Sequence, residues 1–378
     1  MNCRTYSIKE PGYMSSLGVG IVGLPNSGKT TLFNALSRSG ALVASYPYAT
    51  IEPNVREVPV SDVRLTEFAR LTESARMVPA TVRFIDIAGL AEGASRGEGV
   101  GNRFLSSIRD VDAVVHVVRG FEESDGCDDN SDINPVRDVE LIETELRLYD
   151  LEIIGRELKK ARHLAKSGAK DCVERVTALE RIEEATSSEV LSDRASLASE
   201  LELIAPDMKL LILKPTLLVL NLEHPDDRSA VHERELMEWA RPRGMAVLTV
   251  NALVEAELSE LDEEDALLFS VEMGIREGSL DRIVSASYEL LGLITFFTTG
   301  PDESRAWPIP AGLTAAQAAG KIHSDFEAGF VKAEVVHQDD FLAAGGSFTA
   351  SREAGTFRLE GREYIVQDGD VVVFKFAT

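Results

Sequence analysis

The chain has 378 residues, 44% of them hydrophobic and 27% charged, and its formal net charge is -24. This length accommodates two or three domains, whereas the excess of negative charge argues against general binding to DNA or other nucleic acid, because phosphates would be repelled. No apolar run approaches the roughly 20 residues of a membrane-spanning helix, and three widely spaced cysteines give neither a disulfide framework nor a zinc pattern. We therefore expect a cytoplasmic protein without a membrane partner.

The first segment with clear chemistry follows an N-terminal extension at residues 1–17. Residues 23–30, GLPNSGKT, fit the phosphate-binding pattern Gly-x-x-x-x-Gly-Lys-Ser/Thr. A β-prone run precedes this loop and a helical run follows it, so backbone N–H groups and the positive end of a helix would surround a phosphate. Lys29 would reach the outer phosphates and the Thr30 hydroxyl would hold Mg2+. The predicted nucleotide-binding residues of this loop are Asn26, Ser27, Gly28, Lys29, Thr30 and Thr31.

Two further motifs are typical of a nucleotide-dependent switch. Asp86 ends a predicted strand at 82–86 and begins an Asp-x-x-Gly sequence that places Gly89 three residues later. Asp86 would hold Mg2+ through water, and the Gly89 amide would sense the γ-phosphate. Thr50, between the loop and this motif, is the expected Mg2+ ligand of the first switch. We therefore predict Lys29, Thr50 and Gly89 as catalytic residues and Thr30, Thr50 and Asp86 as metal ligands.

Leu90 stands where Ras-like enzymes place a glutamine that orients the attacking water. A leucine side chain cannot do this, so either another group positions the water or turnover is slow. We hypothesise that Asn26 helps to hold a K+ ion beside the β- and γ-phosphates, as a fixed positive charge.

A helical insertion interrupts the α/β pattern. A strand at 113–118 and an acidic loop at 122–132 are followed by apolar residues at spacings of three and four from Val139 to Ile153, and again from Val173 to Leu201. This pattern predicts an antiparallel helical hairpin, with the apolar stripe as its own seam rather than a partner-binding face. Strands at 216–221 and 246–251 then resume the α/β pattern, whose continuous β-branched runs favour a parallel sheet.

Asn221 ends the strand at which switch proteins of this type read the base. Guanine readers carry Asn-Lys-x-Asp, but Leu222, Glu223 and His224 follow here, so no carboxylate stands at the fourth position. Guanine thereby loses its main discriminating partner, whereas the Asn221 amide retains the ability to pair with adenine. We predict Asn221, Leu222 and Glu223 in the base site, with ATP as the ligand and GTP weaker or comparable.

The C-terminal part has a different pattern. Strand-like runs at 294–298, 306–309, 330–336, 364–366 and 371–376 surround one predicted helix at 314–322. A short, mostly β unit with one helix suggests a β-grasp module. The predicted organisation is a P-loop NTPase domain at 18–135 and 206–293, a helical hairpin at 136–205 and a β-grasp domain at 294–378.

From about residue 18 to 378 the chain resembles the YchF (Obg-like ATPase) family of P-loop proteins. The segments that carry the resemblance are 20–26, 46–54, 86–95, 97–104, 295–300, 306–307, 320–326 and 364–369. The resemblance implies an α/β P-loop fold with a mostly parallel sheet, an inserted coiled coil and a C-terminal TGS (β-grasp) domain. It also implies ATP preference, the hydrophobic residue at Leu90 and association with ribosomes. The family's last base-contacting loop falls at Asn251 and Ala252. The family's usual base motif is Asn-x-x-Glu, but here His224 stands at the fourth position and Glu223 one place earlier.

Three functions are consistent with these residues. The leading one is a slow ATPase that acts as a switch with ribosomes, in translation or the stress response. The alternatives are a GTP-preferring enzyme and a binding protein whose nucleotide only sets its conformation. A basic cluster on the hairpin is the predicted RNA-facing surface, together with Lys321 and Lys332 of the C-terminal part. The cluster comprises Arg156, Lys159, Lys160, Arg162, Lys166 and Lys170.

Overall fold

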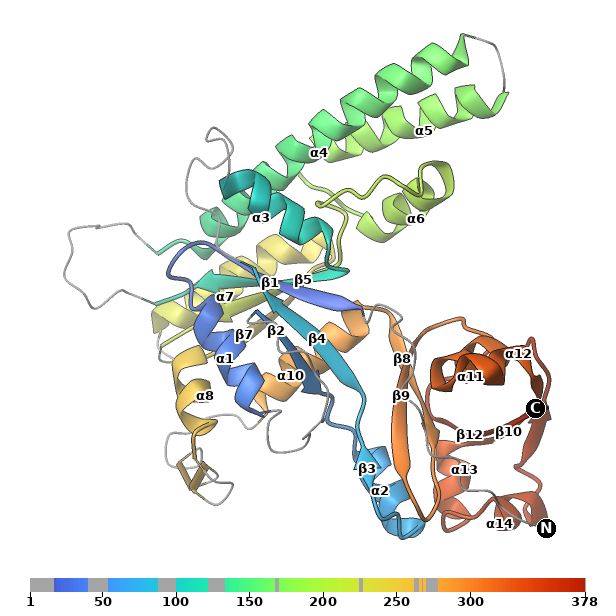
Figure 1. The fold of residues 1–378 in the computed structure, drawn as a ribbon. Coiled ribbons are helices and arrows are strands. Elements are labelled where there is room, and N and C mark those ends of the chain that lie inside the picture. Colours follow the sequence, from blue (N-terminus) through green and yellow to red (C-terminus); the bar gives the residue numbers. More distant parts are fainter. Residues whose placement is uncertain are drawn as a thin grey trace. The chain divides into compact units, whose positions relative to one another are not determined.

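The computed structural model describes residues 17–39, 54–87, 100–121, 133–166, 170–223, 227–261, 265–266, 268–269 and 278–377. The described residues form two compact units (Figure 1). The larger unit comprises 17–58 and 83–290, and the smaller unit comprises 59–82 and the chain from 291 onward. Thr50, Gly89, Leu90 and His224 lie outside the described residues. Among the helices of the described ranges, none is both long and apolar enough to cross a bilayer.

The larger unit is built on a six-stranded sheet with the strand order β2-β4-β1-β5-β6-β7. Its strands are β1 (Gly18–Val22), β2 (Val55–Pro59), β4 (Thr81–Asp86), β5 (Ala113–Arg119), β6 (Thr216–Asn221) and β7 (Ala246–Val250). The pairs β1–β4, β1–β5, β5–β6 and β6–β7 are all parallel. β1 is buried along its whole length and β5 as far as Val118, which explains their continuous β-branched runs. The predicted mostly parallel sheet is confirmed.

Several helices lie between these strands in the chain or follow the last of them. They are α1 (Lys29–Ser39), α3 (Val100–Arg109), α7 (Asp227–Ala240) with the short η1 (Arg241–Arg243), α8 (Ala252–Leu258) and α10 (Ser279–Leu290). Leu236 and Ala240 of α7 pack on Val118, Leu218 and Leu220 of the sheet. Figure 1 shows α3 and α7 on one side of the sheet and α1, α8 and α10 on the other. The sheet is therefore covered on both faces, as parallel sheets generally are.

The inserted hairpin consists of α4 (Pro135–Ala165) and α5 (Lys170–Ser187), followed by α6 (Arg194–Ile204). Asn134 starts α4 by accepting a hydrogen bond from the Arg137 amide at 2.9 Å, and Pro135 occupies the first helical position. The predicted antiparallel hairpin is confirmed, since α4 and α5 lie side by side (Figure 1).

The apolar stripe of the hairpin divides between two partners. Ile154 and Leu158 of α4 are buried in one cluster with Leu179 and Ile182 of α5, which makes the predicted seam. Val139 instead packs with Val118 and Leu218 of the sheet, because α4 is longer than α5 and its first turns lie over the larger unit's sheet. The prediction that Val173 belongs to the seam is wrong: its side chain is exposed near the hairpin tip.

The smaller unit has its own six-stranded sheet, ordered β11-β10-β12-β8-β9-β3. The strands are β3 (Met77–Val78), β8 (Leu293–Thr298), β9 (Ser304–Pro310), β10 (Phe330–His337), β11 (Arg358–Glu360) and β12 (Asp370–Phe376). α11 (Ala315–Ile322) begins with a capping box between Thr314 and Gln317. Its alanines pack with Phe296 on one face of the sheet. The helix and four of the five strands match the prediction, whereas residues 364–366 form no strand and make only an isolated bridge between Ile365 and Thr314.

Three short helices of the smaller unit were not predicted: α12 (Ser324–Ala328), α13 (Gln338–Ala343) and α14 (Phe348–Glu353). Each has five or six residues, too few for a helical periodicity to show in the sequence. Their starts are nevertheless capped by side chains. His323, His337 and Ser347 each accept a hydrogen bond from a backbone N–H of the following turn.

Residues 59–82, assigned above to the P-loop domain, belong to the smaller unit. This segment carries α2 (Val63–Leu71) and β3. Phe68 of α2 makes edge-to-face contacts with Phe297 and Phe341, at centroid distances of 5.0 and 5.6 Å. The Arg64 guanidinium donates a hydrogen bond to Asp368 at 2.6 Å. The segment thus covers the face of the sheet opposite α11, which corrects the predicted assignment of residues 59–82 to the P-loop domain.

Hydroxyl groups also hold this segment to the smaller unit. Thr72 lies 2.9 Å from Thr299, and Ser74 donates to the Gly300 carbonyl at 2.6 Å. Both partners belong to the stretch 295–300, on which the family resemblance partly rested. Residues 299–300 of this stretch therefore have a structural role in this molecule: they hold a segment that lies far away in the sequence.

Candidate nucleotide-binding site

The phosphate loop connects the end of β1 to the start of α1. A Cβ atom added to Gly23 would lie 2.3 Å from the Val117 carbonyl oxygen, and one added to Gly28 would lie 2.2 Å from Asn221 Nδ2. Gly28 also has a φ of +89°, in the region that favours glycine. Both glycines of the motif are therefore required by the close approach of neighbouring strands and side chains.

Lys29 and Thr30 occupy the first two positions of α1. The Lys29 side chain is buried, and its Nζ donates to the Leu24 carbonyl across the loop at 2.7 Å. Thr30 Oγ1 donates to Asp86 Oδ2 at 3.3 Å, which brings together two of the three predicted metal ligands. Burial lowers the pKa of Lys29, while the nearby Asp86 raises it. Burial raises the pKa of Asp86, and the Thr30 hydrogen bond and Lys29 act against that shift.

These oxygens suit a hard divalent cation. Mg2+ is usually bound by one or two protein oxygens and completed by water and substrate phosphates, and Thr30 and Asp86 supply one hydroxyl and one carboxylate. Within the described ranges, no group of three or more histidine, cysteine, aspartate or glutamate side chains could hold a metal by itself. One hydroxyl and one carboxylate fit a Mg2+ ion whose remaining ligands are water and nucleotide phosphates.

Asn221 links the phosphate loop to the loop that follows β7. Its side chain is 5% exposed. Nδ2 donates to the Ser27 carbonyl at 3.1 Å, and Oδ1 accepts from the Ala252 amide at 3.0 Å. One carboxamide thus satisfies two backbone groups from separate loops and still has one N–H and one lone pair left.

Asn251, also predicted to bind nucleotide, is the N-cap of α8. Its Oδ1 accepts from the Val254 amide at 3.0 Å, and its Nδ2 donates to the Glu223 carbonyl. The structure therefore brings Asn221, Leu222, Glu223, Asn251 and Ala252 together at the carboxyl ends of β6 and β7. The Asn251 side chain holds the two loops in place and starts a helix.

Two residues of this region were missed by the sequence analysis. The Gly120 amide donates to the Asn221 carbonyl at 2.8 Å, and a Cβ there would lie 2.6 Å from Leu222. A glycine directly after a buried strand is the signal that indicates such a close approach.

His116 lies behind the phosphate loop, on β5 opposite Val22 of β1. Burial, and to a lesser extent Lys29, lowers the pKa of His116 to about 3. It is therefore neutral at any physiological pH.

Comparisons with known proteins identify relatives of this chain. Residues 18–153 match the family model described as 50S ribosome-binding GTPase, and residues 293–377 match YchF-GTPase_C, described as a protein of unknown function. The ribosome-binding ATPase YchF of Bacillus subtilis is 43% identical over 364 residues, which cover 96% of this chain and 99% of that protein. The protein of the same name from Escherichia coli O157:H7 is 43% identical over 94% of this chain and 98% of its own length.

A solved structure extends the match to the fold. The YchF GTPase of Schizosaccharomyces pombe superimposes with a TM-score of 0.82 at 32% identity, covering 97% of this chain and all of that chain. The family resemblance seen in the sequence is thus confirmed by both sequence and structure. The chain belongs to the YchF family.

Proposed function

We propose that this chain is a nucleotide-dependent switch protein that hydrolyses ATP to ADP and phosphate and acts with ribosomes in the cytoplasm, in translation or the stress response. The observation that carries the proposal is that Lys29, Thr30 and Asp86 meet at one phosphate loop. The relatives named ribosome-binding ATPase support ATP and the ribosome as partners.

The side chains divide the work of phosphoryl transfer. Lys29, already placed at the loop, would exchange the Leu24 carbonyl for the outer phosphate oxygens. Thr30 and Asp86 would hold Mg2+, which when bound neutralises charge on the β- and γ-phosphates. Thr50 and Gly89 lie outside the described residues; we propose Thr50 as a further metal ligand and the Gly89 amide as the γ-phosphate sensor.

Asn221 favours adenine over guanine. Adenine presents the N7 acceptor beside the N6 amino donor, whereas guanine presents two acceptors, N7 and O6. The one N–H and one lone pair that Asn221 has left match adenine at both positions and guanine at only one. Leu222 and Glu223 follow on the same loop and would border the base.

The experiment that tests this function is calorimetric titration of the full chain with ATP and GTP in the presence of Mg2+. We expect ATP to bind about tenfold more tightly, because one mismatched hydrogen bond costs about 1 kcal/mol or more. GTP binding tenfold more tightly than ATP would instead identify a GTP-preferring enzyme. That second candidate is favoured by the Schizosaccharomyces pombe relative, which is described as a GTPase.

Asn26 is the residue that we propose to help hold K+ in the loop. Its side chain is exposed at the middle of the loop, and its φ is +60°. We expect turnover in KCl to exceed turnover in NaCl by on the order of tenfold, since a fixed positive charge would oppose the charge that develops on the phosphates. Asn26→Gly should abolish the difference without the backbone strain of alanine.

The control for this experiment is Asn34→Gly, which removes an exposed asparagine side chain from the adjacent α1. It should leave the ratio of the two rates unchanged. Equal rates in the two salts for the unmodified chain would eliminate the K+ site.

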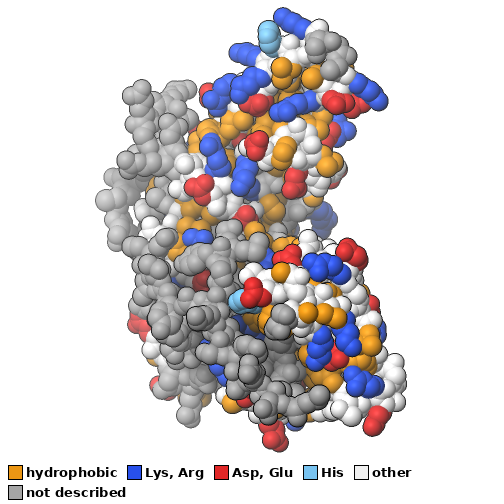
Figure 2. Space-filling model, turned by 45° about the vertical axis from the view of Figure 1, so that its right-hand side comes forward, with side chains coloured by type: hydrophobic (Ala, Val, Ile, Leu, Met, Phe, Trp, Pro, Cys, Tyr) orange, Lys and Arg blue, Asp and Glu red, His pale blue; other side chains and the backbone are white. Residues whose placement is uncertain are grey.

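The basic cluster of the hairpin is the proposed ribosomal RNA contact. Figure 2 shows lysine and arginine side chains gathered over the hairpin at the top of the view. Arg162, Lys160 and Lys170 pair with Glu180, Glu157 and Glu174, at 2.9, 2.7 and 3.6 Å. Arg156, Lys159 and Lys166 are exposed and have no carboxylate partner among the described residues, so these three remain available for phosphates.

Replacing Arg156, Lys159 and Lys166 together with glutamine should weaken co-sedimentation with ribosomes. The slope of log affinity against log salt should fall by about two to three, because each lost phosphate contact contributes somewhat less than one. The matched control replaces Arg234, Arg241 and Arg282, three exposed arginines of the same unit. Equal slopes for the two triple variants would exclude this surface.

A further inference from the structure

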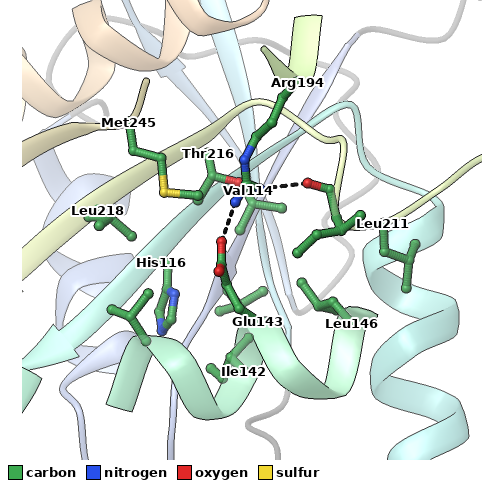
Figure 3. Close-up of a pocket in the computed structure, with 13 residues that line it drawn as sticks. Val114, His116, Ile142, Glu143, Leu146, Arg194, Leu211, Thr216, Leu218 and Met245 are labelled. Atoms are coloured by element: carbon green, nitrogen blue, oxygen red, sulfur yellow. Dashed lines mark hydrogen bonds and ion pairs between the residues drawn. The ribbon is translucent and has the colours of Figure 1, made fainter. Parts of the chain in front are cut away.

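An internal cavity lies at the base of the hairpin, between α4 and the sheet of the larger unit (Figure 3). Its volume is about 20 Å3, which is room for one water-sized particle. Most of the side chains around it are apolar, whereas His116 of β5, Glu143 of α4, Arg194 of α6 and Thr216 of β6 are polar. Polar groups from four separate elements therefore line one small space.

His116 has a hydrogen-bonding atom left over at this cavity. The residue is 3% exposed, and its Nε2 is buried without a hydrogen-bond partner among the described residues. Because burial lowers its pKa to about 3, the ring is neutral. A buried polar atom without a protein partner indicates a bound water in a native protein.

Glu143 has hydrogen-bonding capacity left as well. One of its carboxylate oxygens accepts a hydrogen bond from Arg194. The other oxygen lies 3.7 Å from Arg147 and 4.0 Å from Arg243, too far for a hydrogen bond. Figure 3 shows the His116 ring next to the Glu143 side chain, without a dashed line between them. The unused capacity of both groups therefore meets at the same cavity.

The lining of the cavity selects a neutral particle. A cation there would lie against the Arg194 guanidinium and an anion against the Glu143 carboxylate. A water molecule can donate to the carboxylate and can either donate to or accept from an imidazole nitrogen, and the Thr216 hydroxyl offers a third partner. We propose that one buried water bridges His116 and Glu143 and thereby ties the strand behind the phosphate loop to the base of the hairpin.

This water bridge joins two parts of the larger unit that are far apart in the sequence. On the sheet side, His116 is followed by Val117, whose carbonyl closely approaches Gly23 of the phosphate loop. On the hairpin side, Glu143 and Arg194 join α4 to α6. The water bridge thus helps to position the hairpin relative to the phosphate loop, and it does so independently of the nucleotide and ribosome partners proposed above.

A crystal structure of the full chain that resolves ordered waters tests the water bridge directly. We expect one water within about 3.2 Å of both His116 Nε2 and an oxygen of Glu143. An empty cavity, or a protein atom bonded to Nε2 in place of a water, would overturn the proposal. This measurement uses the unmodified protein, so it does not depend on the folding of a variant.

Hydrogen exchange of the full chain tests what the water bridge holds in place. His116→Leu removes the polar atom, whereas His116→Gln keeps one near the position of Nε2, so the two variants form a matched pair. In His116→Leu we expect the amides of residues 139–146 of α4 to exchange about five- to tenfold faster, the effect of one lost hydrogen bond on local opening. In His116→Gln they should stay within about twofold of the unmodified chain, and residues 154–161, farther along α4, should be unchanged in both variants. Equal exchange of residues 139–146 in the two variants would contradict the proposal.

Discussion

Lys29→Met is expected to lower the rate of ATP hydrolysis about 10²–10³-fold, the usual cost of removing one preorganised group that stabilises transition-state charge. Lys29 is buried and held across the loop by the Leu24 carbonyl, so its ammonium group is in place before the nucleotide arrives. Methionine keeps most of the apolar stem and removes the charge, which separates electrostatics from packing. The measurement is single-turnover phosphate release at saturating ATP, with and without ribosomes.

The control for this variant is Lys209→Met, which removes an exposed lysine of the same unit. Its rate should stay within a factor of two, and both variants should retain the Tm of the unmodified chain. If Lys29→Met hydrolyses ATP as fast as the unmodified chain, Lys29 does not act on the phosphates. If the unmodified chain shows no turnover above Lys29→Met even with ribosomes, the chain is a nucleotide-gated binding protein.

The phosphate side of the site could be predicted from sequence because its geometry is local. The glycines, Lys29 and Thr30 lie within eight consecutive residues, and the strand and helix that flank them are adjacent in the chain. Asp86 required one further step, the rule that the carboxyl ends of parallel strands meet at one edge. The register of β1 with β4 places Asp86 beside Ile21, as that rule requires.

The placement of residues 59–82 could not be predicted in this way. Phe68 and Arg64 belong to α2, whose sequence is that of an ordinary amphipathic helix. Nothing in its spacing indicates that Phe68 contacts Phe297 or that Arg64 bonds to Asp368. Such contacts join segments more than two hundred residues apart, and a pattern of periodicity reports only which face of an element is apolar. It does not report which sheet covers that face.

The base side of the site could be predicted only in part. The sequence indicated that Asn221 ends a strand, but not that both ends of its carboxamide are bonded to the protein. Similarly, the sequence indicated that Asn251 lies in the predicted base-contacting loop, but not that its side chain caps α8 and bonds to Glu223. Side-chain hydrogen bonds between loops depend on loop conformation, which short patterns determine poorly.

Asn221→Ala is expected to weaken ATP binding about 100-fold and to destabilise the fold as well. The substitution leaves the Ser27 carbonyl and the Ala252 amide buried without partners, at about 1–3 kcal/mol for each group. Because Ser27 belongs to the phosphate loop, the loss should affect ADP and ATP alike. Calorimetry with both nucleotides and urea unfolding of the apo chain measure the two effects.

Asn251→Ala is the matched control, since it removes an asparagine from the neighbouring loop. It costs one helix cap, about 1 kcal/mol, and the hydrogen bond from Asn251 to the Glu223 carbonyl. It should reduce ATP affinity by no more than about tenfold. Similar losses in the two variants would show that Asn221 is merely one of several loop contacts and would remove its special position in the site.

The analogue 7-deaza-ATP lacks the N7 acceptor, so it separates the proposed contact of Asn221 with adenine from the structural role of Asn221. The unmodified chain should bind this analogue about tenfold less tightly than ATP, because the remaining Asn221 N–H would lose its partner. Asn221→Ala lacks that N–H and should bind ATP and the analogue equally. The difference between the losses of binding free energy in the two proteins then measures the contact between Asn221 and N7. If the unmodified chain binds both nucleotides equally, Asn221 stabilises the loops without reading the base, and ATP preference must then originate in residues beyond β6.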